Sequence, residues 1–536
     1  MALLAIARLF QLQKEMILKR ILPLISLAAV LVTTTIHAQT PVRGGSLTAI
    51  MDIQPASLDP IMGNGFNSDP NIYNMIYDKL VTLDGKGAPA PHLAESWVLQ
   101  DDMKSLTLKL RKGVVFHDGT AFNAEAVKFN LDRVTAAGSK APASAFIGDV
   151  SSVEVIDPLT VKINLRSPSG PYVSVPGKAG TAILASLAIQ PGMMISPTAF
   201  KADPDGFARK PVGTGPFKFV EWVGGDHLAV TRNPNYWRNG ADQKSLPYLD
   251  KVEVKFISNT SVKLVQLQSG SAQLGDAMPA KDWDKIKGIK ALDLISRPQI
   301  SNCFISFNTT VEPFNNKDLR LAIAYGVNRP LIEKVVTKGL GQINATLWGP
   351  LDWIYDKDVK AQEYNLEKAK EHYKKSGYKG KLTLTVIQRD PDTQVAQLMQ
   401  SQLKAVGIDL NVEVLERLSA MEKVNGKRYD FALLRGPSPT PDPDITFSAF
   451  YGRNARQNFS GQTDEKLFTA IERARTTFLR DQRKRYYSEA QQLIVDGAYY
   501  VYLLGNPIYE VKRKELNGLK RESVGEWVLT EAWLSK

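Results

Sequence analysis

Residues 381–416, KLTLTVIQRDPDTQVAQLMQSQLKAVGIDLNVEVLE, carry the clearest fold signal in the chain. LTLTVIQ (382–388) and IDLNVEVLE (408–416) alternate apolar and polar residues, which is the period of a β-strand. Between them apolar residues recur at helical spacing, and Gly407 is well placed to end the helix. This helical stripe runs through Val395, Leu398, Met399, Leu403 and Val406. Strand, helix and strand joined by short links predict a parallel, right-handed βαβ unit within an α/β fold.

A further strand, YDFALLR (429–435), is predicted after this unit. In open α/β sheets, ligands bind beyond the carboxyl ends of the strands. Two loops leave such ends here, residues 388–392 and residues 436–444. If the two strands are parallel neighbours, both loops open at one edge of the sheet. The second loop has four prolines in nine residues, so its backbone loses little freedom when a ligand binds.

Most other strand patterns lie in the first half of the chain. They are residues 44–50, which follow a glycine turn, and residues 105–111, 152–156, 160–165 and 251–257. Asp157 and Pro158 predict a turn between two of them.

Helices are predicted mainly in the second half. Asn315 or Asn316 is placed to cap a helix that carries Leu319 and Ile323, and Pro330 is placed to start the next helix. Residues 464–480 and 482–496 predict a pair of helices rich in Arg, Glu and Ala.

The N-terminus has the pattern of a secretory signal. Lys19 and Arg20 precede an apolar run over residues 21–36, and we expect cleavage after Ala38. The run is shorter than the roughly 20 apolar residues that span a bilayer. Met16 is the expected start, because MILKR supplies a basic opening. Cys303 is the only cysteine, so no cysteine after the signal can carry a lipid. These features predict a free protein in the periplasm rather than a lipoprotein.

Charge and motifs exclude several functional classes. The formal net charge is +12, and +9 remains after residues 1–38 are removed, but no basic run is long enough for a nucleic-acid arm. The five histidines form no HExxH, and GxSxG, GxxxxGK and CxxC are absent. We therefore expect no catalytic residues, no metal site and no cofactor. Two distant carboxylates could still act as acid and base, which leaves an exported hydrolase as the alternative.

Four ordered blocks of sequence then carry a family resemblance. The blocks are HLAESW (92–97) with LTLKLRKGVVFHDGTAFNAEAVKFN (106–130); GTGPF (213–217) with EW (221–222) and RNPNYW (232–237); FNT (307–309) with PF (313–314) and LRLAIAYGVNR (319–329); and DPD (442–444) with RDQRKRYYSEAQQLIVD (480–496). In these blocks the sequence resembles the peptide/nickel-type (family 5) extracellular solute-binding proteins of ABC transporters.

The resemblance implies an α/β fold of the periplasmic binding protein type II kind, with two lobes, an extra β-rich domain and a ligand cleft between the lobes. The implied parts are a signal peptide (1–38), a discontinuous domain I (39–76, 212–297 and 503–536), an inserted domain II (77–211) and domain III (298–502). The conspicuous 111–120 block belongs to domain II, away from the cleft. Arg111, Lys112, His117 and Asp118 are therefore expected to define the fold rather than to touch ligand.

The implied function is capture of a small solute by hinge closure and its delivery to an ABC permease in the inner membrane, without catalysis. The protein is expected to act as a monomer. The solute is predicted to be an oligopeptide or a related compound such as a glutathione-like molecule, an opine or a metal chelate. A chaperone or sensor with the same fold is a third hypothesis, because a fold alone does not fix function.

Eight residues are the candidate ligand contacts. From the two loops they are Arg389, Asp390, Arg435, Asp442 and Asp444, from domain I they are Asn64 and Phe66, and Trp353 is a candidate aromatic lid. The two arginines suit a carboxylate, which a guanidinium holds with two parallel hydrogen bonds. Asp392 has the alternative of capping the following helix. Relatives that bind dipeptides carry an aspartate where Pro439 stands here, which argues against simple dipeptide capture.

Overall fold

The computed structural model describes residues 40–535 except 64–68, 85–88, 101–103, 148–149, 167–170, 173–179, 277, 280–281, 351, 390, 437–441, 454, 456, 478 and 523–525. The predicted signal segment, the start at Met16 and the cleavage after Ala38 lie outside the described residues. Within the described part, no helix is long and apolar enough to cross a membrane.

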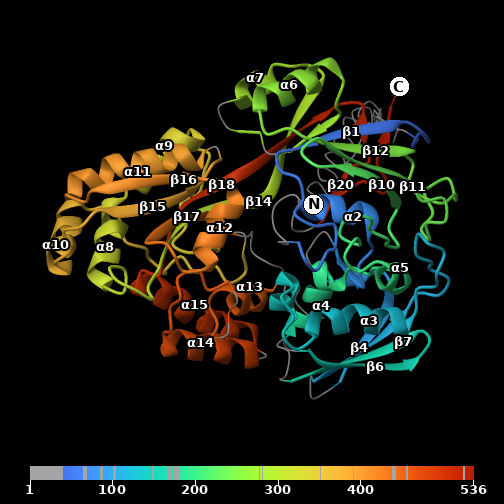
Figure 1. Ribbon diagram of the computed structural model, residues 1–536, viewed down its shortest axis with the longest axis horizontal. Helices are drawn as coiled ribbons and strands as arrows, with labels where there is room; N and C mark the ends of the chain where they lie inside the picture. The colour runs from blue at the N-terminus through green and yellow to red at the C-terminus, as the bar shows by residue number, and fades with distance from the viewer. Residues whose placement is uncertain are drawn as a thin grey trace, which may run out of the picture. The chain divides into compact units, whose positions relative to one another are not determined.

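A ten-stranded mixed sheet dominates the structure (Figure 1). Its strands, in spatial order, are β10 (Phe217–Val223), β11 (His227–Arg232), β12 (Lys251–Phe256), β1 (Ser46–Met51), β13 (Leu274–Gly275), β18 (Tyr500–Arg513), β14 (Leu292–Phe307), β17 (Phe431–Arg435), β15 (Leu382–Ile387) and β16 (Leu410–Leu415). The two long strands β14 and β18 pair antiparallel at its middle and join the two halves. Their length, which local patterns did not predict, makes the sheet continuous.

The predicted βαβ unit is confirmed. β15 pairs in parallel with β16 and also with β17, so the two predicted loops do leave one edge of the sheet. Helix α11 (Asp392–Val406) connects β15 to β16 and ends at Gly407, whose φ is +100°. β16 begins at Leu410 rather than at residue 408, because the Ile408 amide still donates to the Leu403 carbonyl at the helix end.

A separate four-stranded sheet lies within residues 77–211. It consists of β4 (Ala94–Leu99), β5 (Ser105–Leu110), β7 (Thr160–Leu165) and β6 (Val150–Asp157), in that order. The predicted turn between β6 and β7 is present, and Asp157 accepts a hydrogen bond from the Leu159 amide at 2.7 Å. The same range also contains α3 (Ala124–Thr135), the 3₁₀ helices η1 (Pro142–Phe146) and η2 (Gln190–Gly192), α4 (Ala182–Leu187) and α5 (Pro197–Ala202).

The predicted helices of the second half are present with shifted ends. Asn316, not Asn315, caps α8 (Lys317–Gly326) by accepting from the Asp318 amide at 2.9 Å. Pro330 lies in the first turn of α9 (Arg329–Thr337). The predicted pair is α14 (Glu465–Thr476) and α15 (Arg480–Gly497), so the first of them ends four residues earlier than predicted. Its last turn closes where the Thr477 amide donates to the Ala474 carbonyl.

The remaining elements are short or peripheral. They are α2 (Asp69–Ile76), β2 (Val81–Leu83), β3 (Pro89–Pro91), β8 (Pro171–Tyr172), β9 (Gly180–Thr181), α6 (Thr260–Ser269), α7 (Trp283–Lys287), α10 (Leu366–Ser376), α12 (Arg417–Asn425), α13 (Pro443–Phe450), β19 (Leu516–Asn517), β20 (Lys520–Arg521), β21 (Trp527–Val528) and β22 (Trp533–Leu534).

The largest apolar core crosses the expected border between domains II and III. It contains Leu106 and Leu184 from residues 77–211 together with Phe304 and Phe447 from residues 298–502. The expected borders at 297/298 and 502/503 fall inside β14 and β18. The three-domain division therefore stays a prediction, and two of its borders lie in continuous strands.

Candidate functional site

Arg389 and Arg435 meet at the carboxyl ends of neighbouring strands, around one carboxylate. Arg389 Nε and Nη2 donate to Asp392 Oδ2 at 2.9 and 2.7 Å, and Arg435 Nε donates to Asp392 Oδ1 at 2.8 Å. Asp392 is buried, whereas the arginine side chains keep 21% and 16% of their surface exposed. The capping alternative for Asp392 is wrong, because this residue lies inside the first turn of α11 and Pro391 is its N-cap.

Counted over the described residues Arg389, Arg435 and Asp392, the arginine cluster carries one net positive charge. Burial by itself raises the pKa of Asp392, but the guanidinium groups of Arg435 and Arg389 outweigh burial and hold that pKa below its ordinary value. Two cations therefore share one ionised carboxylate. Burial raises the pKa of the neighbouring Cys303 to about 12, which keeps this thiol neutral. Both guanidinium groups are partly exposed, and a guanidinium can bind a carboxylate with two parallel hydrogen bonds.

An acidic cluster in the other half of the sheet lies near enough to Arg435 for their charges to interact. Asp52 directly follows β1, and its amide donates to both oxygens of Asp276 at 3.1 and 3.2 Å. The fully buried Lys263 of α6 donates to Asp276 Oδ1 at 3.1 Å and also binds Asp52. With both carboxylates ionised, this cluster carries one net negative charge.

Asp52 is electrostatically coupled to the arginine cluster. Burial and the nearby Asp276 raise the pKa of Asp52 to about 7, and Lys263 and Arg435 oppose that rise. In return Asp52 favours the charged form of Arg435. The half-buried Asp52 and the partly exposed Arg435 thus present opposite charges to each other across the middle of the sheet.

Sequence reasoning missed Asp52, Lys263 and Asp276, although two signals were present. Asp52 follows an apolar strand, which is the rule that singled out Arg389 and Arg435. Lys263 lies one helical turn before the buried Leu267, so a charged residue stands on the apolar face of α6. A lysine in that position requires a buried partner.

The two DPD aspartates belong to a structural network. Asp442 is fully buried and accepts two hydrogen bonds from Arg483, at 2.9 and 2.7 Å. It also caps α13 by accepting from the Asp444 amide. Asp444 accepts from Arg475 Nε at 3.1 Å and from Ser448 at 3.2 Å. Asp442 has no exposed surface, and a role of Asp442 or Asp444 as a ligand contact stays a prediction.

The Trp353 side chain packs against neighbouring side chains of α15. Its ring lies edge-on to Tyr487, with centroids 6.2 Å apart, and the guanidinium carbons of Arg480 and Arg483 lie 5.4 and 5.7 Å from it. These contacts are those of a packed side chain, and the role of Trp353 as a lid stays a prediction. Asn64, Phe66, Asp390 and Pro439 lie outside the described residues.

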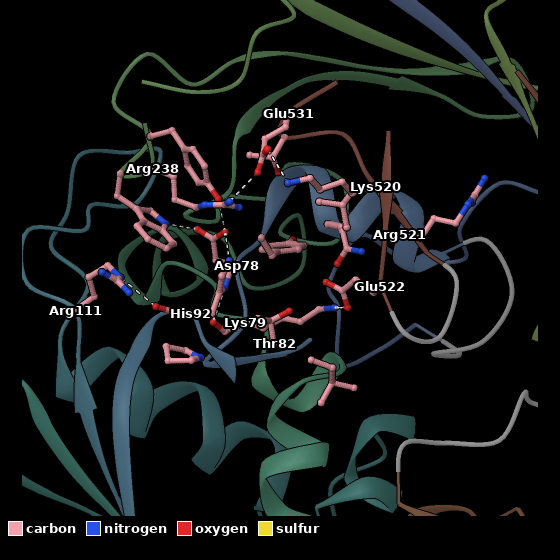
Figure 2. A pocket seen from close by; sticks show the side chains of 18 residues that line it. Asp78, Lys79, Thr82, His92, Arg111, Arg238, Lys520, Arg521, Glu522 and Glu531 are labelled. Carbon is pink, nitrogen blue, oxygen red and sulfur yellow. Dashed lines mark hydrogen bonds and ion pairs between the residues drawn. The ribbon is translucent and has the colours of Figure 1, made fainter. Parts of the chain in front are cut away.

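The first two family blocks, within residues 92–130 and 213–237, meet around Asp78, beside a pocket of about 460 Å³ (Figure 2). Asp78 accepts hydrogen bonds from Thr214, Tyr236 and Trp237 at 3.0, 2.9 and 2.9 Å. Arg111 lies 4.4 Å from the Trp237 ring centroid. The cations that line this pocket have carboxylate partners: Lys79 with Glu522, Arg111 with Glu95, Arg238 and Lys520 with Glu531, and Arg521 with Glu510.

His117 and Asp118 tie the same blocks together. His117 Nε2 lies 2.9 Å from the Gly215 carbonyl, and Lys218 donates to the His117 carbonyl. Burial lowers the pKa of His117 to about 4. Asp118 accepts from Ser196 and from Thr120. These contacts support the expectation that the motif defines the fold.

A family model for the bacterial extracellular solute-binding proteins, family 5 (middle region), matches residues 88–458. The chain belongs to this family. Its members bind solutes, so the hydrolase alternative has no support, and solute capture for an ABC importer is confirmed.

Relatives of this family 5 protein bind peptides and related compounds. It is 28% identical over 528 residues to the glutathione-binding protein GsiB of Escherichia coli K12, covering 95% of this chain and 97% of the relative. The periplasmic binding protein DppA of Helicobacter pylori, solved with the peptide STSA, is 26% identical with a TM-score of 0.82. AgaA of A. tumefaciens R10, solved with agropinic acid, is 26% identical with a TM-score of 0.81. Each alignment to a structure covers 92% of this chain and 99% of the other.

Proposed function

We propose that this family 5 protein captures a small peptide-like solute with a free carboxylate and an ammonium group. The observation that carries the proposal is the pair of charged clusters at the strand ends. The arginine cluster has one net positive charge beside a buried carboxylate, and Asp52 opposes Arg435 from the other half of the sheet. A solute with both charges satisfies the two clusters at once.

Each cluster is chemically suited to bind one end of the solute. The carboxylate end is held by Arg389 and Arg435, whose guanidinium forks match the geometry of a carboxylate. The ammonium end is held by Asp52, which ionises fully when a cation replaces the water around it. Lys263 and Asp276 keep the Asp52 side chain in place. Asn64, Phe66 and Asp390 remain proposed contacts on sequence grounds alone.

The relatives support this class of solute. Glutathione, the peptide STSA and agropinic acid, the ligands that their names give, all carry a carboxyl group. The proposed solute is therefore an oligopeptide, a glutathione-like compound or an opine. We also propose that the protein is exported by a cleavable signal over residues 1–38, is not lipidated, works as a free periplasmic monomer and passes its solute to an inner-membrane ABC permease.

Thermal unfolding of the chain from residue 39, with and without each solute, tests the proposal. The panel holds di- to pentapeptides, glutathione, opines, nickel chelates and oligosaccharides. A solute at 100 times its Kd adds about 2.7 kcal/mol to the free energy of unfolding. A shift with peptides whose carboxyl end is free, and none with the matching C-terminal amides, is the expected result. Equal shifts for acid and amide, or shifts with sugars alone, would contradict the proposal.

Variants then connect binding to the site. Arg435→Gln and Asp52→Asn are each expected to weaken binding of the panel solute at least tenfold. Arg320→Gln is the matched control, because Arg320 is a buried arginine whose side chain donates to the backbone carbonyls of Phe314, Asn315 and Gly497. The control should lower the unfolding temperature and leave the Kd unchanged. A larger loss of affinity in the control than at Arg435 would place the site elsewhere.

A further inference from the structure

Helix α13 (Pro443–Phe450) joins the solute site to the region of residues 77–211. It is the next element along the chain after β17, which ends at Arg435. Six of its eight residues are buried, so the helix is covered on nearly every side. One side packs on α14, and another packs on η1 and α4. The helix therefore belongs to the second half by sequence, and its outer side contacts the inserted region.

Strong contacts fix α13 within its own half. The Phe447 ring is stacked between the rings of Trp348 and Tyr487. The ring centroids lie 4.4 and 4.7 Å from that of Phe447, with interplanar angles of 17° and 11°. The Asp442–Arg483 pair holds the first turn, and Asp444 binds Arg475. A movement of this half consequently carries α13 with it as a rigid piece.

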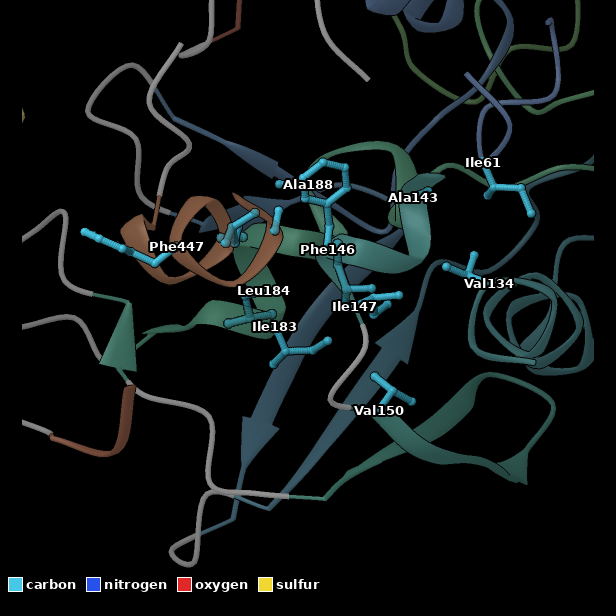
Figure 3. Close-up of a cluster of buried hydrophobic side chains, with 14 of the residues drawn as sticks. Ile61, Val134, Ala143, Phe146, Ile147, Val150, Ile183, Leu184, Ala188 and Phe447 are labelled. Carbon is cyan, nitrogen blue, oxygen red and sulfur yellow. The ribbon is translucent and has the colours of Figure 1, made fainter. Parts of the chain in front are cut away.

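The contact with the inserted region is apolar. Figure 3 shows Phe146 of η1 and Leu184 of α4 beside the helix that carries Phe447. Phe146, Ile183 and Leu184 are 6%, 5% and 1% exposed. Apolar surfaces attract without strict direction and can separate and rejoin, unlike a network of buried hydrogen bonds.

Solute entry requires this contact to open. Arg389 and Arg435 are mostly covered, and Asp52, which opposes Arg435, belongs to the other half of the sheet. Residues 308–499, which include β15, β16 and β17, are joined to the rest of the chain through β14 and β18, and the second half can turn about these two strands. A turn that separates Asp52 from Arg435 also draws α13 away from η1 and α4.

We propose that the contact of α13 with η1 and α4 is a latch that holds the protein closed around the solute site. Phe146 and Leu184 are thus positioning residues, which set the open–closed equilibrium without touching solute. The location of the site rests on the proposed function, but the latch does not depend on which solute binds. Because the latch needs no solute, it also keeps a fraction of the empty protein closed.

Distance measurement between two spin labels in the empty protein tests the latch. The labels are attached at Lys128→Cys on α3 and Glu472→Cys on α14, both exposed, while the native Cys303 is 1% exposed and stays unlabelled. Leu184→Ala should shift the distance distribution of the empty protein to longer values. Leu108→Ala, in the four-stranded sheet, removes an equally buried leucine and should leave the distribution unchanged. If Leu184→Ala does not fold, Leu184→Val should give a smaller shift in the same direction.

A kinetic measurement separates the latch from a loss of stability. Solute enters the open form, so Leu184→Ala should bind glutathione or a tetrapeptide from the panel faster, whereas Leu108→Ala should not. An unchanged distance distribution in Leu184→Ala would overturn the latch whatever the panel shows. A shift to longer distances with no solute bound by any panel member would support the latch and count against the proposed solute class.

Discussion

Arg483 donates from both terminal nitrogens to the two carboxylate oxygens of Asp442, at 2.9 and 2.7 Å, and neither side chain is exposed. This pair joins the start of α13 to α15, two elements that sequence order separates by α14. Tyr487 accepts a third hydrogen bond from Arg483, at 3.0 Å. The first aspartate of the DPD turn therefore holds the start of α13 against α15.

Asp442→Ala should lower the free energy of unfolding by about 3–5 kcal/mol, because it leaves a buried guanidinium without its partner. Urea denaturation followed by circular dichroism measures the loss. Arg453→Ala is the control, since the pair of Arg453 with Glu465 is exposed and should contribute little to stability. If Asp442→Ala kept full stability and lost solute binding, Asp442 would be a ligand contact after all.

Asp52 makes stability fall as pH rises. Its pKa is about 7 in the folded protein, raised above the ordinary 3.8 chiefly by burial, so between about pH 4 and pH 7 the folded state holds more protons than the unfolded state. Asp52→Asn should remove this slope and gain stability relative to wild type as the pH rises. Urea midpoints at pH 5 and pH 8 test this, with Asp250→Asn as the exposed control. If stability depended on pH in the same way in wild type and Asp52→Asn, the raised pKa of Asp52 would be contradicted.

Binding of a zwitterionic solute should release protons near pH 7, because the ammonium group favours ionised Asp52. Calorimetry in two buffers of different ionisation enthalpy counts the protons released. Asp52→Asn should release none. Equal proton release by the variant and the wild type would assign the effect to another group.

His117 should contribute to acid unfolding. Burial lowers its pKa to about 4 from 6.5, so the folded state holds fewer protons between these values, and stability is lost as the pH falls from 6.5 to 4. His117→Gln should flatten this part of the profile. His227→Gln is a control of opposite sign, because the hydrogen bond to Asp226 raises the pKa of His227 and its proton stabilises the folded state at low pH. A flatter profile in both variants would contradict the assignment.

Gly407→Ala should cost about 1 kcal/mol, since its φ of +100° is unfavourable for a residue with a Cβ. The cost comes from the backbone, because the nearest atom to the added Cβ, on Tyr373, would lie at an ordinary 3.7 Å. Gly288→Ala is the matched control, as Gly288 also ends a helix but has a φ of −74°. Urea denaturation compares the two, and equal losses would show that the left-handed conformation of Gly407 is not the cause.

Local patterns predicted a good part of this fold. Alternation located β5, β7 and β15 to within about one residue, because the side chains of a strand point alternately to two faces whatever the strand pairs with. The helical stripe and Gly407 located α11 and its end. Parallel pairing of β15 with β17 then brought Arg389 and Arg435 together, because the carboxyl ends of parallel neighbours share one edge.

Longer-range features were not predictable in this way. The local context of Asp392 suits a helix cap, but its carboxylate is held by Arg389, three residues away, and by Arg435, which is distant in sequence. The strands β14 and β18 have no simple alternation over their full length and exist by pairing with each other.

The sequence by itself determined the α/β class, the βαβ unit with its arginine-bearing loops, and, through four ordered blocks, the family. These depend on neighbours a few residues apart, where periodicity and turn chemistry act. Only the tertiary structure decided that Asp52 opposes Arg435, that Asp442 belongs to Arg483, and that α13 packs on η1 and α4. Each of these contacts joins residues far apart in the chain, and their meeting depends on how the two halves pack, because burial and charge pairing act between whatever surfaces the fold brings together.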